Sequence, residues 1–223
     1  MKSRTHNESH TAKAESKFKI FCKECKIELK SKTARKTVSN REDKRIEYQK
    51  EYYYCPCSPH PKLSRKYFSM EVIDAEIRSV INELKSKAFS KREYTIRRLQ
   101  SKRYSLRDEQ KLLLEELTNK QEQKNDLVVA TLMFDNDSQM ENFNVLHEET
   151  IDLEAKINAL SATIETIKAL IALLKDGGEA NDESAFCNLL VDSISINQTG
   201  NPEFTYNTVG QLFVEIVGKK AAS

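Results

Sequence analysis

Four of the five cysteines fall between residues 22 and 57. Cys22 and Cys25 form a CxxC pair, a spacing that lets two thiolates reach one metal ion from a tight turn. A second pair, Cys55 and Cys57, begins after 29 intervening residues. Two pairs of thiolates, each at the end of a short β-type segment, are typical of a zinc ribbon, in which the metal replaces a core too small to fold alone. The sequence predicts one structural Zn²⁺ per chain.

The second pair is irregular, because Pro56 alone separates its cysteines. The fourth ligand therefore stays open between Cys57 and His60. A redox CxxC pair would need a βαβ context, which the residues around Cys22 do not supply. A zinc deaminase would need an HxE motif followed by PCxxC, and the second cysteine of that motif is missing here. We expect a structural site and no catalytic zinc.

The elements that must hold these thiolates are short strands at residues 18–21 and 52–54, joined by a basic hairpin within 26–51. Residues 17–69 are the predicted zinc β-ribbon domain. Residues 1–69 carry 18 Lys and Arg against 8 Asp and Glu, although the whole chain has a net charge of only +2. Such a concentration is expected of a module that contacts nucleic-acid phosphates, and the alternative is a solvated basic surface. The candidate DNA-binding residues are Lys30, Lys32, Arg35, Lys36, Arg41, Lys44, Arg45, Lys62, Arg65 and Lys66.

Residues 1–16 are polar and basic without hydrophobic periodicity, and we expect a disordered tail. The chain has no run of 18 consecutive apolar residues and no apolar segment after its first residues. This pattern predicts neither a membrane span nor a secretory signal. A cytoplasmic, reducing location follows as an expectation, and it favours metal binding over disulfides for the clustered cysteines.

Helical periodicity begins at Met70. Residues 70–90 are predicted to form a linking helix, and residues 91–175 an antiparallel coiled coil. The seam of a coiled coil is the row of residues that faces the partner helix. In the second arm these residues follow one another at alternating steps of three and four, whereas polar residues interrupt the seam of the first arm. The second-arm seam is Phe143, Leu146, Thr150, Leu153, Ile157, Leu160, Ile164, Ile167, Ile171 and Leu174. Such a seam is buried only against another helix.

The turn between the arms is unusually apolar. Residues 127–134 carry more apolar side chains than the seam needs, which indicates either a contact site for another molecule or a plug against Met140 and Phe143. The candidate tip contacts are Val129, Leu132, Met133 and Phe134.

Residues 176–223 are expected to form a short helical turn and strands, the last at 211–217, which pack back on the ribbon. Cys187 lies there in an apolar context and is expected to be a buried small residue. The predicted fold class is α+β and mostly helical, with a small zinc β-ribbon domain, C-terminal strands and a long inserted antiparallel coiled-coil hairpin.

This order of elements resembles the C-terminal half of the large serine recombinases, the group of phage integrases and transposon resolvases. The resemblance covers residues 17–217 and depends on Phe21-Cys22-Lys-Glu-Cys25, Tyr53-Tyr54-Cys55, the helix that starts at Met70, and the coiled coil before residues 189–196. It implies that the ribbon binds attachment-site DNA and that the coiled-coil tip contacts other subunits. The glycine usual in that family after the first CxxC is Lys26 here.

The family's nucleophilic serine and arginine cluster belong to an N-terminal domain that residues 1–223 do not contain, so the resemblance implies no catalysis by this chain. The expected function is the DNA-binding and subunit-interaction part of a serine site-specific recombinase, not itself an enzyme. Its expected partners are double-stranded DNA, a second copy through the coiled-coil tip, and a catalytic recombinase subunit, with no membrane. The alternative is a zinc-ribbon and coiled-coil assembly protein that binds protein partners only.

Overall fold

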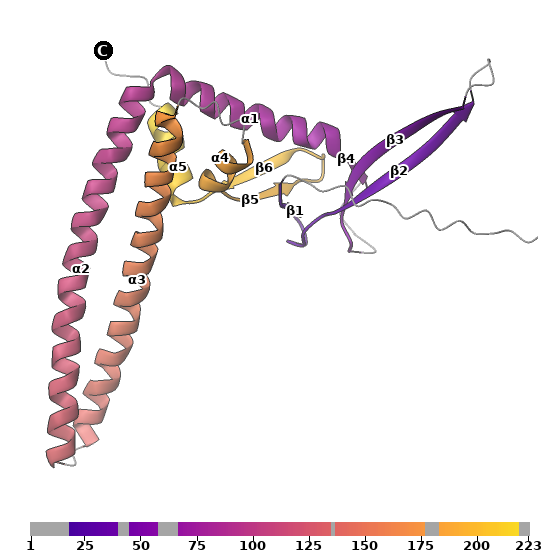
Figure 1. Ribbon diagram of the computed structural model, residues 1–223. Coiled ribbons are helices and arrows are strands. Elements are labelled where there is room, and N and C mark those ends of the chain that lie inside the picture. Colours follow the sequence, from indigo (N-terminus) through magenta and orange to yellow (C-terminus); the bar gives the residue numbers. More distant parts are fainter. Residues whose placement is uncertain (1–17, 40–44, 58–66, 135–136, 177–182, 219–223) are drawn as a thin grey trace, which may run out of the picture. The chain divides into compact units, whose positions relative to one another are not determined.

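The computed structural model describes residues 18–39, 45–57, 67–134, 137–176 and 183–218 (Figure 1). Its helices are α1 Met70–Ser90, α2 Arg92–Phe134, α3 Asp137–Lys175, α4 Glu183–Leu190 and α5 Thr208–Gly218. Its strands are β1 Ile20–Cys22, β2 Lys30–Ser39, β3 Arg45–Tyr54, β4 Tyr67–Ser69, β5 Val191–Ile196 and β6 Pro202–Tyr206. The structure is mostly helical with two three-stranded sheets, which confirms the predicted α+β class. Two compact units divide the chain, residues 1–85 with 182–207 and residues 86–181 with 208–223.

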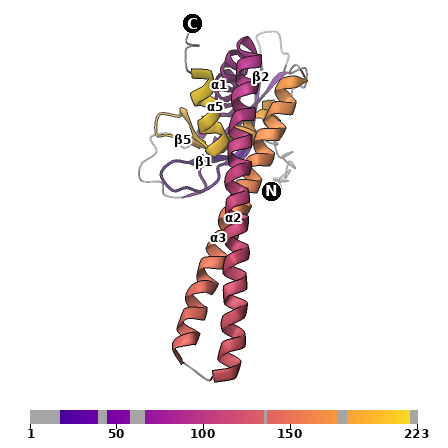
Figure 2. The same ribbon diagram turned by 90° about the vertical axis from the view of Figure 1, so that its left-hand side faces the viewer.

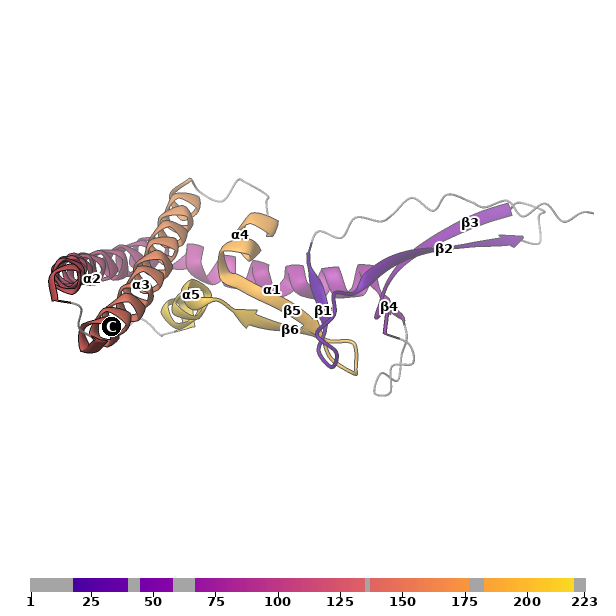
Figure 3. The ribbon, with the colours of Figure 1, turned by 90° about the horizontal axis from the view of Figure 1, so that it is seen from below.

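One sheet of the first unit joins distant parts of the chain in the order β1-β5-β6 (Figure 3). Strand β1 pairs in parallel with β5, so that Cys22 lies opposite Ile196. Strand β5 pairs antiparallel with β6. The expected return of the C-terminal strands to the N-terminal part of the chain is therefore present in the β1–β5 ladder.

The other sheet has the order β2-β3-β4. Strands β2 and β3 pair along their whole length, from Lys30 opposite Tyr54 to Ser39 opposite Arg45, which gives a long two-stranded hairpin. Tyr53 is only 2% exposed and donates a hydrogen bond of 2.8 Å from its hydroxyl to Asp74 Oδ1 of α1. This bond joins the base of the hairpin to the linking helix α1. Along one face of that helix, about every fourth residue is buried.

The turn between β5 and β6 of one sheet packs against β4 of the other sheet. The side-chain oxygen of Asn197 accepts hydrogen bonds from the backbone amides of Thr199 and Asn201, both at 3.0 Å. Gly200 has a φ of +96°, and a Cβ added there would lie 3.2 Å from the ring of the buried Phe68 on β4. Glycine is therefore needed at this position both for its backbone conformation and for its close approach to β4.

In the second unit, α2 and α3 lie side by side and run antiparallel (Figure 2). All ten predicted seam positions of α3 are buried or half-buried, as are Leu99 and Leu106 of α2. Polar seam positions of α2 also find partners, because Gln110 donates to Ser161 Oγ at 2.6 Å. The pairing of the two predicted arms is thus confirmed, with polar contacts where the first arm lacks apolar residues.

Residues 211–217 are not a strand, and this prediction was wrong. They belong to helix α5, whose buried residues are Val209, Gly210, Phe213, Ile216 and Val217. Their spacing is that of one helix face, although a short apolar run can also be interpreted as alternation. Helix α5 contacts α2 and α3 and belongs with them to the second unit.

Part of α3, Met140–Lys175, is long and apolar enough to cross a membrane by length and composition alone, which the sequence analysis did not expect. The core helix of a soluble protein passes the same test. The buried apolar residues of α3, between Leu153 and Leu174, lie on the side of the helix that faces its neighbours. Helix packing within the unit accounts for them.

Candidate metal centre

Three sulfur atoms converge in the first unit. The Sγ atoms of Cys22, Cys25 and Cys55 all lie within 4.8 Å of one another, and those of Cys25 and Cys55 are 3.3 Å apart. Tetrahedral thiolates at about 2.3 Å from Zn²⁺ would be separated by about 3.8 Å. The sulfurs are therefore close enough to share one metal ion, as the sequence predicted for these three residues.

The first half of the site is a tight turn at the end of β1. The backbone amide of Cys22 donates to the carbonyl of Ile27, and the amide of Lys26 donates to the carbonyl of Cys22, both at 2.9 Å. Lys26 takes a φ of +59°. This left-handed conformation turns the chain back after Cys25, so that the backbone amide of Leu29 donates to the carbonyl of Ile20 at 2.8 Å.

The C-terminal strands support this turn. Lys23 donates its backbone amide to the carbonyl of Ile196 at 3.1 Å, and its ammonium lies 2.6 Å from Glu203. The hydrogen bond from Lys23, followed by one from Asn197, holds the pKa of Glu203 below its usual value. Gln198 also donates to Glu24 at 3.2 Å. Residues 196–203 thus position the first cysteine pair, a role that the cysteine spacing alone does not reveal.

The second half of the site follows β3 directly, because Cys55 is the residue after that strand. Burial is the main cause that raises the pKa of the Cys55 thiol, to about 12, and the neighbouring Cys25 and Cys22 raise it further. The backbone amide of Cys57 donates to this sulfur and acts in the opposite direction. Repulsion between neighbouring thiolates raises the pKa of Cys55. A bound cation would lower that pKa by stabilising the charged form.

The fourth ligand stays open between Cys57 and His60. Cys57 is half-buried beside the cluster, but its sulfur is not among the three that converge. His60 lies outside the described residues. Cys187 is buried on α4, where burial raises the pKa of its thiol to about 11, and it does not belong to the cluster. The expectation that Cys187 is a buried small residue is confirmed.

Lys26 provides a test of how the turn is built. A residue other than glycine in the left-handed region costs about 1–2 kcal/mol, and the exposed Lys26 side chain lies outside the cysteine cluster. We expect Lys26→Gly to raise the stability of the metal-loaded first unit by up to about 1 kcal/mol, since the more flexible unfolded chain offsets part of the gain. Lys26→Val should lower it. Thermal unfolding of both variants measures the difference, and a Gly variant less stable than the Val variant would contradict the assignment.

The hairpin carries basic residues on one of its faces. Lys30 lies opposite Tyr54, Lys32 opposite Tyr52, and Ala34 opposite Lys50, so that these residues share one side of the β2–β3 ladder. The three lysines are exposed. We call this surface the Lys–Tyr face; it comprises Lys30, Lys32, Lys50, Tyr52, Tyr54 and Tyr67.

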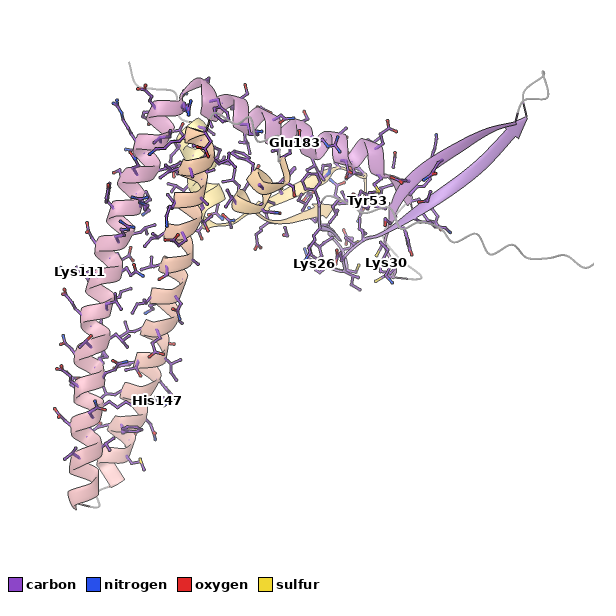
Figure 4. The ribbon with its side chains drawn as sticks, in the orientation of Figure 1. Lys26, Lys30, Tyr53, Lys111, His147 and Glu183 are labelled. Atoms are coloured by element: carbon purple, nitrogen blue, oxygen red, sulfur yellow. The ribbon has the colours of Figure 1, made fainter. Side chains whose placement is uncertain are left out.

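The tyrosines of the Lys–Tyr face are its second component. Tyr67 of β4 pairs with Tyr54, and its ring centre lies 6.0 Å from that of Tyr54 and 6.3 Å from that of Tyr52. The base of this face can be seen near Lys30 in Figure 4. Sequence reasoning selected the first two lysines and missed the tyrosines, whose signal is their alternation along β3 in the same register as the lysines.

The other candidate DNA-binding residues are only partly described. Arg35, Lys36 and Arg45 lie on β2 and β3, but their side chains are not among those described. The remaining candidates are outside the described residues; they are Arg41, Lys44, Lys62, Arg65 and Lys66. Within the described part of the chain, the Lys–Tyr face is therefore the part of the basic hairpin on which a binding proposal can be built.

The tip of the helical pair exposes apolar side chains. Val128 is 40% exposed, Val129 54% and Met140 55%. Next to them is a groove lined by Leu127, Val145 and other residues of α2 and α3. The side chains of Leu132, Met133 and Phe134, the other candidate tip contacts, are not described.

No family model, curated protein or solved structure matches the chain. What the protein does must therefore be inferred from its own residues.

Proposed function

We propose that the chain is the DNA-binding and subunit-interaction part of a serine site-specific recombinase system, in which another subunit or segment cuts the DNA. One structural Zn²⁺ per chain is held by Cys22, Cys25 and Cys55, with Cys57 or His60 as the fourth ligand. Thiolates are soft ligands that favour zinc in such a set. The metal holds the base of the β2–β3 hairpin, since Cys25 precedes that hairpin and Cys55 follows it.

One observation mainly supports this proposal: the cysteine cluster lies at the base of a long hairpin that has exposed lysines and half-buried tyrosines on one face. No acidic residue is present among the described side chains of this Lys–Tyr face, because Glu51 lies opposite Thr33 on the other side of the ladder. Lysines neutralise phosphates and release counterions, while tyrosine rings and hydroxyls offer further contacts to a nucleic acid. The double-stranded DNA partner is proposed on this basis.

A triple variant of the face tests the proposal. In the metal-loaded full chain, we expect Lys30→Gln with Lys32→Gln and Lys50→Gln to weaken binding to a mixed-sequence duplex about tenfold or more at low salt. The slope of log affinity against log salt is negative, and it should become shallower by about 2–3, near 0.9 for each lost phosphate contact. Fluorescence anisotropy between about 50 and 200 mM salt measures both quantities.

A matched control removes the same charge from α3 of the other unit: Lys156→Gln, Lys168→Gln and Lys175→Gln, all at exposed positions. It should bind DNA like the unmodified protein. If the unmodified chain shows no salt-sensitive binding to the mixed-sequence duplex, the proposal of DNA binding is wrong.

The alternative function, an assembly protein that binds proteins only, is favoured by a different observation. Exposed Val128, Val129 and Met140 at the tip of the α2–α3 pair are apolar residues that a contact with another chain would bury. In the recombinase proposal this tip is the subunit-interaction surface, where a second copy binds. The two functions therefore differ in the DNA measurement above and not in the tip.

A further inference from the structure

Charge is unevenly distributed along the α2–α3 pair. Residues 91–111, the first half of α2, carry eight Lys and Arg against three Asp and Glu. Residues 112–155, which include the tip, carry two Lys against eleven Asp and Glu. On the returning half of α3, residues 156–176 carry three Lys against two acids and do not neutralise the first half of α2. One end of the helical pair is thus basic and the other acidic.

Three basic residues of α2 lie with a tyrosine on one exposed face of the helix. Arg97, Tyr104, Arg107 and Lys111 follow one another at steps of seven, three and four residues, which places them on one face of a helix. All four are exposed, and Tyr104 has an exposed fraction of 57%. Lys111 lies on the side of α2 away from α3 (Figure 4). We call these four residues the α2 stripe.

Acidic residues accompany the α2 stripe, because the exposed Asp108 lies on the same helix face next to Arg107. Glu93 and Glu115 lie at its two ends, 3.7 Å from Arg97 and 3.8 Å from Lys111, in exposed pairs that solvent screens. Arg107, at the centre, has no ion-pair partner among the described residues. Beside the stripe, the guanidinium of the half-buried Arg103 lies 5.5 Å from the centre of the Tyr104 ring.

We propose that the α2 stripe is a second nucleic-acid contact, which binds the phosphate backbone while the acidic half of the helical pair is repelled from it. This inference rests on the proposed function, because it names the same partner for a second unit of the chain. The stripe extends for about 21 Å along the helix, which suits an extended polyanion. Two of its three cationic residues are arginines, whose planar guanidinium groups match phosphate oxygens in pairs. The acidic half of a second copy is the competing occupant.

The experiment compares three versions of the metal-loaded full chain in the duplex-binding assay. The stripe variant is Arg97→Gln with Arg107→Gln and Lys111→Gln, all exposed changes to a good helix former. We expect its negative slope of log affinity against log salt to become shallower by about 2–3. Its affinity should fall at every salt concentration. The α3 lysine triple is the control and should leave both unchanged. A version with Arg97→Lys and Arg107→Lys keeps the charge, and it should retain most of the salt slope.

The outcomes separate the two proposals. If the unmodified chain and the α3 control bind DNA, the hairpin triple weakens binding and the stripe variant binds like the control, the second contact is wrong and the proposed function stands. If the stripe variant changes only the sedimentation of the DNA-free protein, the stripe binds the acidic half of another copy and the inference is overturned. If the unmodified chain binds no DNA, both proposals fail. Circular dichroism of each variant establishes that its helices are intact.

Discussion

Removing the metal is expected to unfold the sheets of the first unit and to leave the α2–α3 pair folded. The reason is the location of the cluster: Cys22 ends β1 and Cys55 follows β3, so the ion would join the two sheets of that unit. Structural Zn²⁺ in small domains contributes about 10–16 kcal/mol of apparent binding free energy, more than such a unit has to spare. Amide hydrogen exchange after chelation should show rapid exchange in β2 and β3 with protection retained in α2 and α3.

The chain contains a matched control for this prediction. Cys55→Ala should lower metal content and expose the same amides, whereas Cys187→Ala, which truncates an equally buried cysteine outside the cluster, should keep its full metal content. Native mass spectrometry counts the bound ions and identifies the metal. Protection of β2 and β3 that persists in the metal-free protein would show that the sheets fold without the ion.

The cysteine cluster could be predicted from the sequence because its information is local. A CxxC spacing determines that two sulfurs face one way, and strands on either side of a hairpin bring Cys55 to the same end. The support from Lys23 and Glu203 could not be predicted in this way, because 179 residues separate those partners. Such a contact depends on the parallel β1–β5 pairing, which no spacing in the sequence specifies.

The faces of the elements were less predictable than the elements themselves. Basic composition selected Lys30 and Lys32, but the grouping with Tyr52 and Tyr54 requires the register of β2 on β3. Segment charge also concealed a feature of α2. Over residues 70–175 the net charge is −3, and this average hides the basic first half of the helix. In both cases the average composition was informative, and the position of each charge required the structure.

The error at residues 211–217 shows how packing decides between two local patterns. A run such as Leu212-Phe213-Val214 suits a strand by propensity. In the structure, Val209, Phe213 and Ile216 are buried on one side of α5, because α2 and α3 offer a helix a surface to cover. Tertiary burial thus overrode β propensity at this segment.

Phe213→Ala is expected to lower the stability of the helical unit by about 3–5 kcal/mol, the usual cost of truncating a buried phenylalanine. Phe213 is 0% exposed, and its helix packs on both α2 and α3. Among the described side chains of residues 112–155 only Thr150 and Leu153 are buried, so the loss at α5 should lower the melting temperature of α2 and α3 as a whole. Circular dichroism at the helical band measures this transition.

Phe186→Ala is the matched comparison, because Phe186 is 1% exposed on α4 in the first unit. The same truncation there should lower the stability of the metal-binding unit and leave the α2–α3 transition in place. Metal content should stay complete in Phe213→Ala, since none of the three converging cysteines lies in the unit that this change affects. If both variants lower both transitions equally, the two units unfold as one cooperative structure, and α5 then stabilises the metal-binding unit as much as it does the helical pair.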